Sequence, residues 1–414
     1  MAMNRVLPEA GGEGGPGDPG NQRGRAELVP RLGYSGEDIA ARRRWVEEKT
    51  GAALGQVGAS MLPGEALRGN VENPIGAAQV PLGVAGPLLI AGGHARGTFY
   101  VPLATTEGAL VRSYERGAAA LTRAGGATVH LYADENRVAP VFLFDGVAEA
   151  AEFVNRLPEW FEVLKAEAES TTRHGKLLRL EPRPLGREVM VHFCYSTGDA
   201  HGMNMIVKAT DRACQWLVAN TAARRHLIFS GLEGEKRAAG SLFAGGKGKK
   251  VVAGARLPAR VCRAFLHATP EQMADVWRHT MLGHVQGGTL GYNGHYANGL
   301  TALFIACGQD VANVANSAVG VTTFEVTEEG DLYATATLPS LTMATVGGGT
   351  GLGTARECLE MLGCVGAGQA PKLAEIAAAL VLAGDLSMGA AIASGEFVQA
   401  HEEYGRNRPA EGGA

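Results

Sequence analysis

Four ionisable side chains stand in contexts that packing alone does not explain. Lys236 lies among glycines and alanines in "SGLEGEKRAAG" (230–240), where a lysine can be held over a negative group. Asp310 lies within the most apolar predicted helix, where an ionised carboxylate needs a partner or a shifted pKa. Glu107 opens an apolar stretch in "LATTEGALV". His401 is suited to donate a proton if a C-terminal flap carries it to a site.

The same four residues also have ordinary explanations. A charge run such as the one around Lys236 is typical of a solvated turn. An acid at a helix N-terminus, as at Glu107, is favoured by the helix dipole. Asp310 can serve structural hydrogen bonding, and His401 can be a surface histidine. The residues taken one at a time leave both interpretations open.

Two glycine-bearing turns are candidate ligand sites. "TGDAHGMNMIV" (197–207) feeds a predicted helix, and backbone N–H groups at a helix start suit phosphate or other polar ligand atoms. An ordinary turn between strand and helix is the alternative. "TVGGGTGLG" (345–353) follows no clear βαβ unit. Because no G-x-G-x-x-G fingerprint follows a strand, the sequence does not support a Rossmann domain.

The predicted elements change in type along the chain. Capping residues and apolar spacing predict helices at 35–51, 107–125 and 294–317, the last nearly apolar all round and hence buried. Between them, β-rich runs alternate with a helix at 147–171, broken near Pro158, and the helix that follows the "GDAHGMNM" turn. This β-α-β-β-α order predicts a small α+β module of split βαβ character, at about 138–229, inserted into a larger domain. A hairpin is expected around Gly330.

Composition excludes several classes of protein. The 414 residues suffice for two or three domains, and 38 basic against 42 acidic residues give no argument for nucleic acid or an anionic membrane as partner. The six cysteines lack C-x-x-C spacing and the eleven histidines lack metal-site spacing, so we expect reduced thiols, no metal site and a cytosolic protein. We expect no transmembrane helix and no secretory signal, and a disordered Gly/Pro-rich tail at the N-terminus.

Seven motifs, in their order along the chain, resemble the catalytic portion of hydroxymethylglutaryl-CoA (HMG-CoA) reductase. The resemblance runs from about residue 35 to 405 and is closer to the class I, NADPH-using branch than to class II. The motifs are "ENPIGAAQVPLGVAGPL", "PLATTEG", "GDAHGMNM", "GYNGHYAN", "IACGQD", "TVGGGTGLGTARECLEMLG" and "AGDLSMGAAIASGEFVQAH".

The resemblance implies a four-electron reduction of (S)-HMG-CoA to mevalonate and CoA with two NADPH, via mevaldyl-CoA and mevaldehyde. Each hydride addition places negative charge on a carbonyl oxygen, which a fixed ammonium group stabilises best where water is excluded. A carboxylic acid with a raised pKa can supply the proton to that oxygen. The departing CoA thiolate needs a proton as well, and a mobile histidine suits that step.

Matched motif by motif, the resemblance assigns the four ionisable groups. It implies that Glu107 is the proton donor beside the carbonyl and that Lys236 stabilises the oxyanion. Asp310 is expected between them, hydrogen-bonded to both, and His401 is expected to protonate the CoA thiolate. The residues that the resemblance assigns to the substrate are Arg137, Ser230, Arg237 and Asn298 for the HMG group, and Ser113 and Arg116 for CoA. Those assigned to NADPH are Asp199, Met203, Asn204 and Met205 for the nicotinamide nucleotide, and Thr172 and Arg173 for the 2′-phosphate.

The chain departs from the family's pattern at several of these motifs. The family usually has Asp-Lys-Lys-Pro where this chain has Glu235-Lys236-Arg237-Ala238, and the loop before it is one residue shorter. The usual "GDAMGMNM" is "GDAHGMNM" here, with His201, and a substrate-binding lysine of the family aligns with His279. These changes bear on which acyl-CoA the chain accepts, and they leave the four catalytic groups in place.

The resemblance also implies an architecture. We expect an α+β fold with a large domain built around a long central helix and an inserted small ferredoxin-like cofactor domain. The expected segments are a tail (1–34), a helical segment (35–68), the large HMG-CoA domain (69–137 and 240–400), the NADPH domain (138–229), a linking catalytic loop (230–239) and a C-terminal flap and tail (401–414). Because the family's site forms between subunits, we expect a homodimer or dimer of dimers, which allows Glu107 and Lys236 to come from different chains.

Three other functions are compatible with the same motifs. One is an enzyme of this fold that prefers NAD(H) and oxidises mevalonate, against which Arg173 argues. Another is a reductase for a different 3-hydroxy acyl-CoA. The last is a non-catalytic paralogue that binds acyl-CoA or a dinucleotide, motivated by the altered lysine loop.

Overall fold

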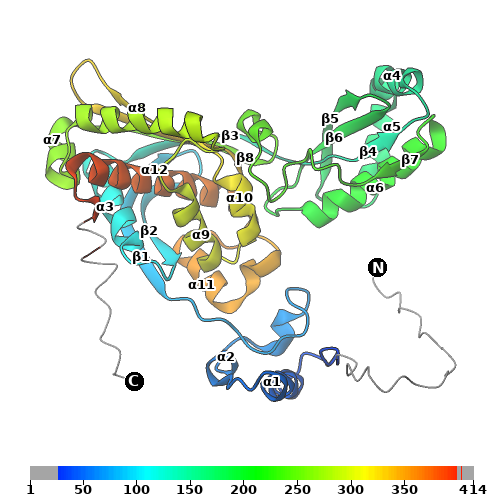
Figure 1. Cartoon of the computed structure of the whole chain (residues 1–414), viewed down its shortest axis with the longest axis horizontal. Coiled ribbons are helices and arrows are strands. Elements are labelled where there is room, and N and C mark those ends of the chain that lie inside the picture. The colour runs from blue at the N-terminus through cyan, green and yellow to red at the C-terminus, as the bar shows by residue number, and fades with distance from the viewer. Residues whose placement is uncertain (1–26, 399–401, 403–414) are drawn as a thin grey trace, which may run out of the picture. The chain divides into compact units, whose positions relative to one another are not determined.

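The computed structural model describes residues 27–398 and 402, and the chain divides into two compact units with the boundary between Ala77 and Ala78 (Figure 1). The first unit carries α1 (Gly36–Thr50), α2 (Gly55–Gly58) and the short 3-10 helix η1 (Gly64–Leu67). The predicted helix of 35–51 is confirmed, with Ser35 and Asp38 forming a capping box and Gly51 ending it at φ 73°.

The second unit is organised by one ten-stranded sheet with two hydrophobic cores. Its strand order is β7-β4-β6-β3-β8-β10-β9, while β2 extends from β3 through β1, and β5 pairs with β6. The strands are β1 (Leu82–Gly92), β2 (Arg96–Ala104), β3 (Ala127–Val138), β4 (Val141–Leu143), β5 (Lys176–Leu185), β6 (Glu188–Ser196), β7 (Arg225–Leu227), β8 (Gly248–Leu257), β9 (Val321–Val326) and β10 (Leu332–Leu341). We call the core on β1, β3, β8 and β10 the large core and the one on β4, β5 and β6 the small core.

Strand β3 belongs to both cores. Residues 127–135 pair with β1 and β8, whereas Asn136, Arg137 and Val138 pair with β6. The last three residues of one strand therefore connect the two cores through backbone hydrogen bonds.

Helix α12 (Ala370–Ser394) fills the large core. It lies against β3, β8, β10 and α3 (Leu110–Arg123), and nearly every residue from Ala370 to Ala391 is buried. Small residues permit the close approach: a Cβ added at Gly117 on α3 would lie 1.8 Å from the carbonyl oxygen of Ala383. By length and composition α12 is apolar enough to cross a membrane, but 78% of that stretch is buried within the protein, as expected for a core helix.

The predicted long helix at 294–317 is wrong, and the long central helix is α12 instead. The chain forms α9 (Tyr296–Ala306), then η5 (Val311–Asn313) and α10 (Val314–Ser317). The break lies at Gly308, which adopts φ 63° and packs so closely on Gly349 that a Cβ would lie 2.4 Å from its carbonyl oxygen. A glycine in the left-handed region ends a helix readily.

The small core contains α4 (Val147–Arg156), η2 (Leu157–Trp160), α5 (Phe161–Glu169) and α6 (Met203–Asn220) beside strands in the order β7-β4-β6-β5, all antiparallel. The predicted break near Pro158 is confirmed, because Pro158 lies in η2 between the two helices. The predicted β-α-β-β-α order implies two strands, β5 and β6, between α5 and α6, but no β-rich run was predicted at β5. Its sequence, "KLLRLEPRPL", contains two prolines, which an edge strand tolerates.

The second unit also contains the following helical segments. They are α7 (Ala259–Val261), continued by one π-helical turn to Leu266, α8 (Pro270–Gly287), η3 (Gly240–Ala244), η6 (Gly348–Gly351) and α11 (Gly353–Met361). The expected hairpin is confirmed as β9 and β10, with Gly330 at φ 79°. All six cysteines lie among the described residues and are buried free thiols, as predicted.

Candidate functional site

The loop between β7 and β8 brings Lys236 to Asp310. The Lys236 Nζ lies 2.7 Å from Asp310 Oδ2, and the two side chains are 45% and 43% exposed. Asp310 caps η5, since its Oδ1 accepts a hydrogen bond from the backbone N–H of Ala312. The expectation of a buried carboxylate inside a helix is therefore wrong. Asp310 follows the break at Gly308 and faces partly to solvent beside the predicted lysine.

The backbone of Lys236 is in an unusual conformation for a non-glycine residue. Its φ of 55° lies in the left-handed region, which costs a side-chain-bearing residue about 1–2 kcal/mol. Gly234, two residues earlier, is also left-handed at φ 71°. Such strain persists only where neighbouring contacts fix the loop.

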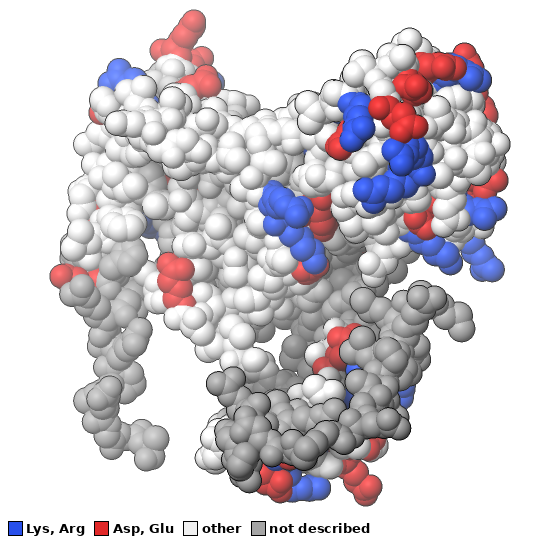
Figure 2. Space-filling view, turned by 45° about the vertical axis from the view of Figure 1, so that its right-hand side comes forward, with Lys and Arg blue, Asp and Glu red and all other residues white. Residues whose placement is uncertain are grey.

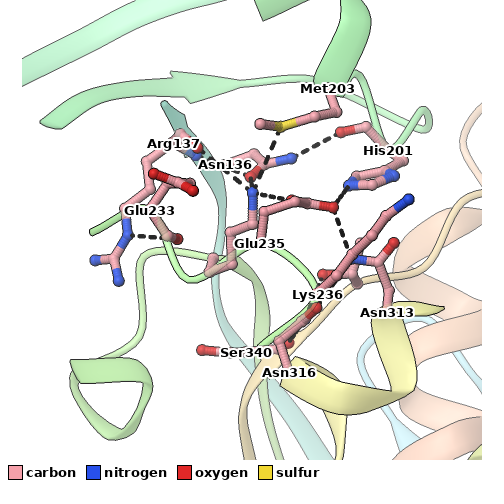
Figure 3. Close-up of polar contacts among 12 residues, drawn as sticks. Asn136, Arg137, His201, Met203, Glu233, Glu235, Lys236, Asn313, Asn316 and Ser340 are labelled. Carbon is pink, nitrogen blue, oxygen red and sulfur yellow. Dashed lines mark hydrogen bonds and ion pairs between the residues drawn. The ribbon is translucent and has the colours of Figure 1, made fainter. Parts of the chain in front are cut away.

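Those contacts are made by Glu235, whose carboxylate is nearly buried (Figure 3). It pairs with Lys247, whose side chain is fully buried, and with His201, whose Nε2 lies 3.4 Å from Glu235 Oε1. Asn313 donates to the same Oε1 at 2.9 Å. Burial by itself raises the pKa of the Glu235 carboxyl, but the hydrogen bond from His201 and the charge of Lys247 outweigh it and hold that pKa far below its usual range.

Lys247 in turn joins residues from separate elements. Its Nζ donates to Asn136 Oδ1 at 2.7 Å and lies 3.6 Å from Met203 Sδ. Burial lowers the pKa of Lys247, and the charge of Glu235 opposes that shift. A buried ammonium with these partners behaves as a structural anchor for the loop.

Arg137, at the end of β3, contacts the start of the same loop. It is 6% exposed, and its guanidinium donates weakly to the carbonyls of Glu233 and Gly245, both at 3.4 Å. Its Nη2 is buried and has no hydrogen-bond partner among the described residues. Burial lowers the pKa of Arg137, although a guanidinium stays protonated. A buried unpaired donor of this kind suits an incoming carboxylate.

The other two substrate residues predicted on this loop have local partners. Ser230 donates its hydroxyl to the carbonyl of Ala139 at 2.7 Å. Arg237 has a mostly exposed side chain that pairs with the buried carboxylate of Glu233 at 3.3 Å. Both residues help to shape the loop that carries Lys236.

Glu107 and Asn298 form a second cluster. Asn298 Nδ2, on α9, donates to Glu107 Oε1 at 3.3 Å, at the mouth of a pocket of about 350 Å³. The pocket is lined by Val80, Ala104, Thr105, Thr106, Glu107, Leu110, Ala297, Asn298, Thr301, Ala302 and Ile305. Residues at successive turns of α9 therefore form one wall. At 1.5 Å per residue, that wall runs for roughly 10 Å from Asn298 to Ile305, toward the helix end from which Asp310 follows.

The two clusters are thus near opposite ends of α9 within one chain. Asp310 contacts Lys236, as expected, but Glu107 is paired with Asn298. The predicted position of Asp310 between both groups is not reproduced by the contacts of the described residues.

Ser113 and Arg116 lie together on α3 and contact α12. Ser113 Oγ donates to Ser387 Oγ at 3.2 Å, and the Arg116 guanidinium donates to the hydroxyl and carbonyl of Ser387. Arg116 also pairs with Glu396 at 3.4 Å. Burial lowers the pKa of Arg116, and the charge of Glu396 opposes the shift.

The predicted turn before α6 connects three motifs. Gly202 caps the helix at φ 73°, and among the described residues no side chain caps the first backbone N–H groups, which begin at Met203. The carboxylate of Asp199 instead accepts from the backbone of Gly368 and Ala370, and its carbonyl accepts from Thr345 and Val346. Asp199 thereby ties the turn to the "TVGGGTGLG" loop and to the start of α12.

The other residues predicted for NADPH lie on the small core. Met203 and Met205 pack against it, and Asn204 is exposed beside them. Thr172 accepts two backbone hydrogen bonds in the turn before β5, and the adjacent Arg173 is exposed. Figure 2 shows basic and acidic side chains mixed on this part of the chain, so a phosphate group would meet local arginines rather than a broadly positive face.

One predicted catalytic residue cannot be placed, and three residues that anchor the lysine loop were not predicted from the sequence. His401 lies outside the described residues. Asn136, Lys247 and Asn313 were missed. The stretch around Lys247, "GGKGKK" (245–250), has the composition of an exposed basic loop. Nothing in the sequence indicates that Lys247 is fully buried.

Comparison with known proteins decides which family these clusters belong to. A family model described as hydroxymethylglutaryl-coenzyme A reductase matches residues 38–406. The chain belongs to the HMG-CoA reductase family. It is 43% identical to the 3-hydroxy-3-methylglutaryl-coenzyme A reductase of Methanothermobacter thermautotrophicus over 89% of this chain and 94% of that protein. It is 43% identical to that of Aeropyrum pernix over 92% of each.

Solved structures share the fold at lower identity. An HMG-CoA reductase of Streptococcus pneumoniae matches with a TM-score of 0.67 and 19% identity, covering 85% of this chain and 96% of that one. A class II reductase of the same organism, bound to NADPH in open conformations, matches with a TM-score of 0.66 and 18% identity, covering 85% and 86%. The resemblance of the seven motifs to this family is confirmed, and so is a mixed fold of helices and sheet.

Proposed function

We propose that the chain reduces HMG-CoA to mevalonate and CoA with two NADPH, and that it does so with the loop and pocket described above. Membership of the HMG-CoA reductase family favours this reaction over the three alternatives considered from the sequence. The observation that carries the assignment of the site is the Lys236 ammonium, fixed 2.7 Å from Asp310 by a loop whose anchors are buried.

Lys236 is proposed to face the carbonyl oxygen that becomes negative during reduction. An ammonium already held in position needs little reorganisation as that charge develops. Asp310 orients the ammonium through the 2.7 Å ion pair between Lys236 Nζ and Asp310 Oδ2. Glu107 is proposed to supply the proton to the oxygen, with Asn298 orienting its carboxyl group. His401 is proposed to protonate the CoA thiolate.

Arg137 is proposed to bind the carboxylate of the HMG group. Its buried Nη2 lacks a partner among the described residues, so an incoming carboxylate would satisfy a group that is costly to leave unpaired. Ser230 and Arg237 are proposed to complete this part of the site from the same loop. Ser113 and Arg116 are proposed to approach CoA.

NADPH, when bound, supplies the hydride. The uncapped start of α6 leaves backbone N–H groups of Met203, Asn204 and Met205 free of side-chain caps, which fits a ligand rich in oxygen atoms. Asp199 holds that turn, and Thr172 and Arg173 are proposed to bind the 2′-phosphate. A guanidinium fork can donate two hydrogen bonds to one phosphate dianion.

Residues 138–229 are proposed to form an inserted ferredoxin-like cofactor domain, within a large substrate domain of 69–137 and 240–400. Their separate core and the antiparallel order β7-β4-β6-β5 support this division. We further propose a soluble cytoplasmic homo-oligomer, a dimer or a dimer of dimers, with sites shared between subunits. The location of Glu107 and Lys236 near opposite ends of α9 supports a site completed by a second chain.

The test is oxidation of NADPH in the presence of HMG-CoA, with mevalonate as the measured product. Lys236→Ala should lower kcat by about 10²–10³, the usual cost of removing one group that stabilises an oxyanion. Lys49→Ala is a matched control, because Lys49 is 44% exposed and lies 2.9 Å from Glu27. No turnover by the wild type would refute the function, and full activity in Lys236→Ala would refute the role of the lysine.

A further inference from the structure

The carboxylate of Glu235 connects three segments that are distant in sequence. It pairs with Lys247 at the start of β8, with His201 in the turn before α6, and with Asn313 in η5. Asn313 continues the connection by donating to Asn316 Oδ1 at 2.9 Å. Glu235 is followed directly by Lys236, so whatever moves this carboxylate also moves the backbone that directs the catalytic lysine (Figure 3).

His201 is the link on the cofactor side. Its backbone carbonyl accepts a hydrogen bond from Asn136 Nδ2 at 2.9 Å, and its ring, 21% exposed, reaches Glu235. Met203, two residues later at the start of α6, lies 3.6 Å from the Nζ of Lys247 through its Sδ. The turn proposed to bind NADPH is therefore connected to the lysine loop by side chains that are buried or nearly so.

We propose that His201 is a positioning residue that couples occupancy of the cofactor turn (199–205) to the orientation of Lys236, through its contact with Glu235. This proposal rests on the proposed function, because it assigns NADPH to that turn. Ordering of the turn by the nucleotide would hold the His201 ring against Glu235 and so favour the left-handed backbone of Lys236.

The coupling has a thermodynamic signature. If NADP⁺ favours the loop conformation that binds substrate, it must increase the affinity for HMG-CoA, and the two ligands must affect each other equally. NADP⁺ carries no hydride to transfer, so the ternary complex with HMG-CoA is stable enough for calorimetry. We expect saturating NADP⁺ to lower the Kd of HMG-CoA by about 5-fold or more in the wild type, the lower end of typical couplings.

His201→Met is the decisive variant. Methionine fills a similar volume but cannot donate to Glu235, and the His201 side chain is 21% exposed, so folding should be retained. The effect of NADP⁺ on the Kd of HMG-CoA should fall to less than about 2-fold, far below the ordinary range of coupling. His226→Met is the matched control, since His226 is 16% exposed, lies 2.9 Å from Asp211 and belongs to the small core, away from the lysine loop. An unchanged effect of NADP⁺ in His201→Met would overturn the proposal.

Kinetics provide a readout that loss of stability would not reproduce. His201→Met should lower kcat at saturating NADPH more than it raises the KM for NADPH, because the nucleotide still binds while Lys236 is less often in position. An unchanged kcat in His201→Met, or a loss confined to the KM for NADPH, would count against the pairing.

Hydrogen exchange separates this proposal from the proposed function. Peptides covering 230–239 should exchange several-fold faster in His201→Met than in the wild type without any ligand, while His226→Met leaves them unchanged. That comparison needs neither HMG-CoA nor turnover. Equal exchange in His201→Met and the wild type would overturn the coupling even in an active enzyme. If His201→Met exchanges faster but the wild type does not oxidise NADPH, the contact between His201 and Glu235 would still stand and only the proposed reaction would be refuted.

Discussion

Replacement of Lys247 by methionine gives the sharpest test of how the lysine loop is held. The Lys247 side chain is fully buried and that of Glu235 is 11% exposed, so neither charge is solvated when its partner is lost. Removing one member of a buried pair costs about 3–5 kcal/mol. Water reaches part of Glu235, His201 Nε2 still lies 3.4 Å from it and Asn313 still donates to it, so we expect the lower end, about 3 kcal/mol, for the loss in free energy of unfolding.

Urea unfolding of Lys247→Met, Glu235→Gln and the double variant measures this loss and its origin. If the cost arises from an unpaired buried carboxylate, the double variant should regain at least about 1 kcal/mol relative to Lys247→Met, because a neutral amide needs no counterion. The m-values must agree among the variants for the comparison to hold. A loss below about 1 kcal/mol in Lys247→Met, or a double variant no more stable than it, would refute a charge anchor at this position.

Three further predictions concern pH, cofactor choice and fold. Because the pKa of Glu235 is lowered in the folded state, its charge stabilises the fold at pH values above the ordinary carboxyl range. The difference in free energy of unfolding between wild type and Glu235→Gln should be constant above about pH 5.5 and shrink as pH falls below about 4.5. Urea titrations at each pH would measure it. Arg173→Ala should raise the KM for NADPH about tenfold and leave that for NADH nearly unchanged, the loss expected for one charge-assisted phosphate contact; equal effects on both would exclude a 2′-phosphate contact. Gly308→Ala should lower the free energy of unfolding by at least about 1 kcal/mol in thermal or urea unfolding, since the residue is left-handed and its Cβ would strike the backbone of Gly349, whereas an unchanged value would mean that this turn relaxes freely.

Local signals in the sequence predicted the elements whose geometry depends on neighbouring residues. Ser35 and Gly51 defined the ends of α1, and Pro158 placed the break between α4 and α5. The turn at Gly330 and the start of α6 after Gly202 followed from similar short-range reasons.

What could not be predicted depends on contacts between distant segments. Apolar residues dominate on both sides of the short stretch Gly308-Gln309-Asp310, so 294–317 resembled one helix, and only packing against Gly349 reveals the turn. Asp310 appeared buried for the same reason. The burial of Lys247 depends on Asn136, Met203 and Glu235, which lie on separate elements. The motifs pointed to the loop around Lys236, but no spacing rule brings these groups together.

The sharing of β3 between the two cores makes Arg137 part of a pivot. The strand passes from the sheet of the large core to that of the small core at Asn136, Arg137 and Val138. A rotation of the small core about this point would displace each atom in proportion to its distance from the pivot, as with a lever. Arg137 would then keep its place while the residues of the small core farthest from β3 move the most. If Arg137 binds the substrate carboxylate as proposed, that binding would be insensitive to a rotation of the small core about this strand.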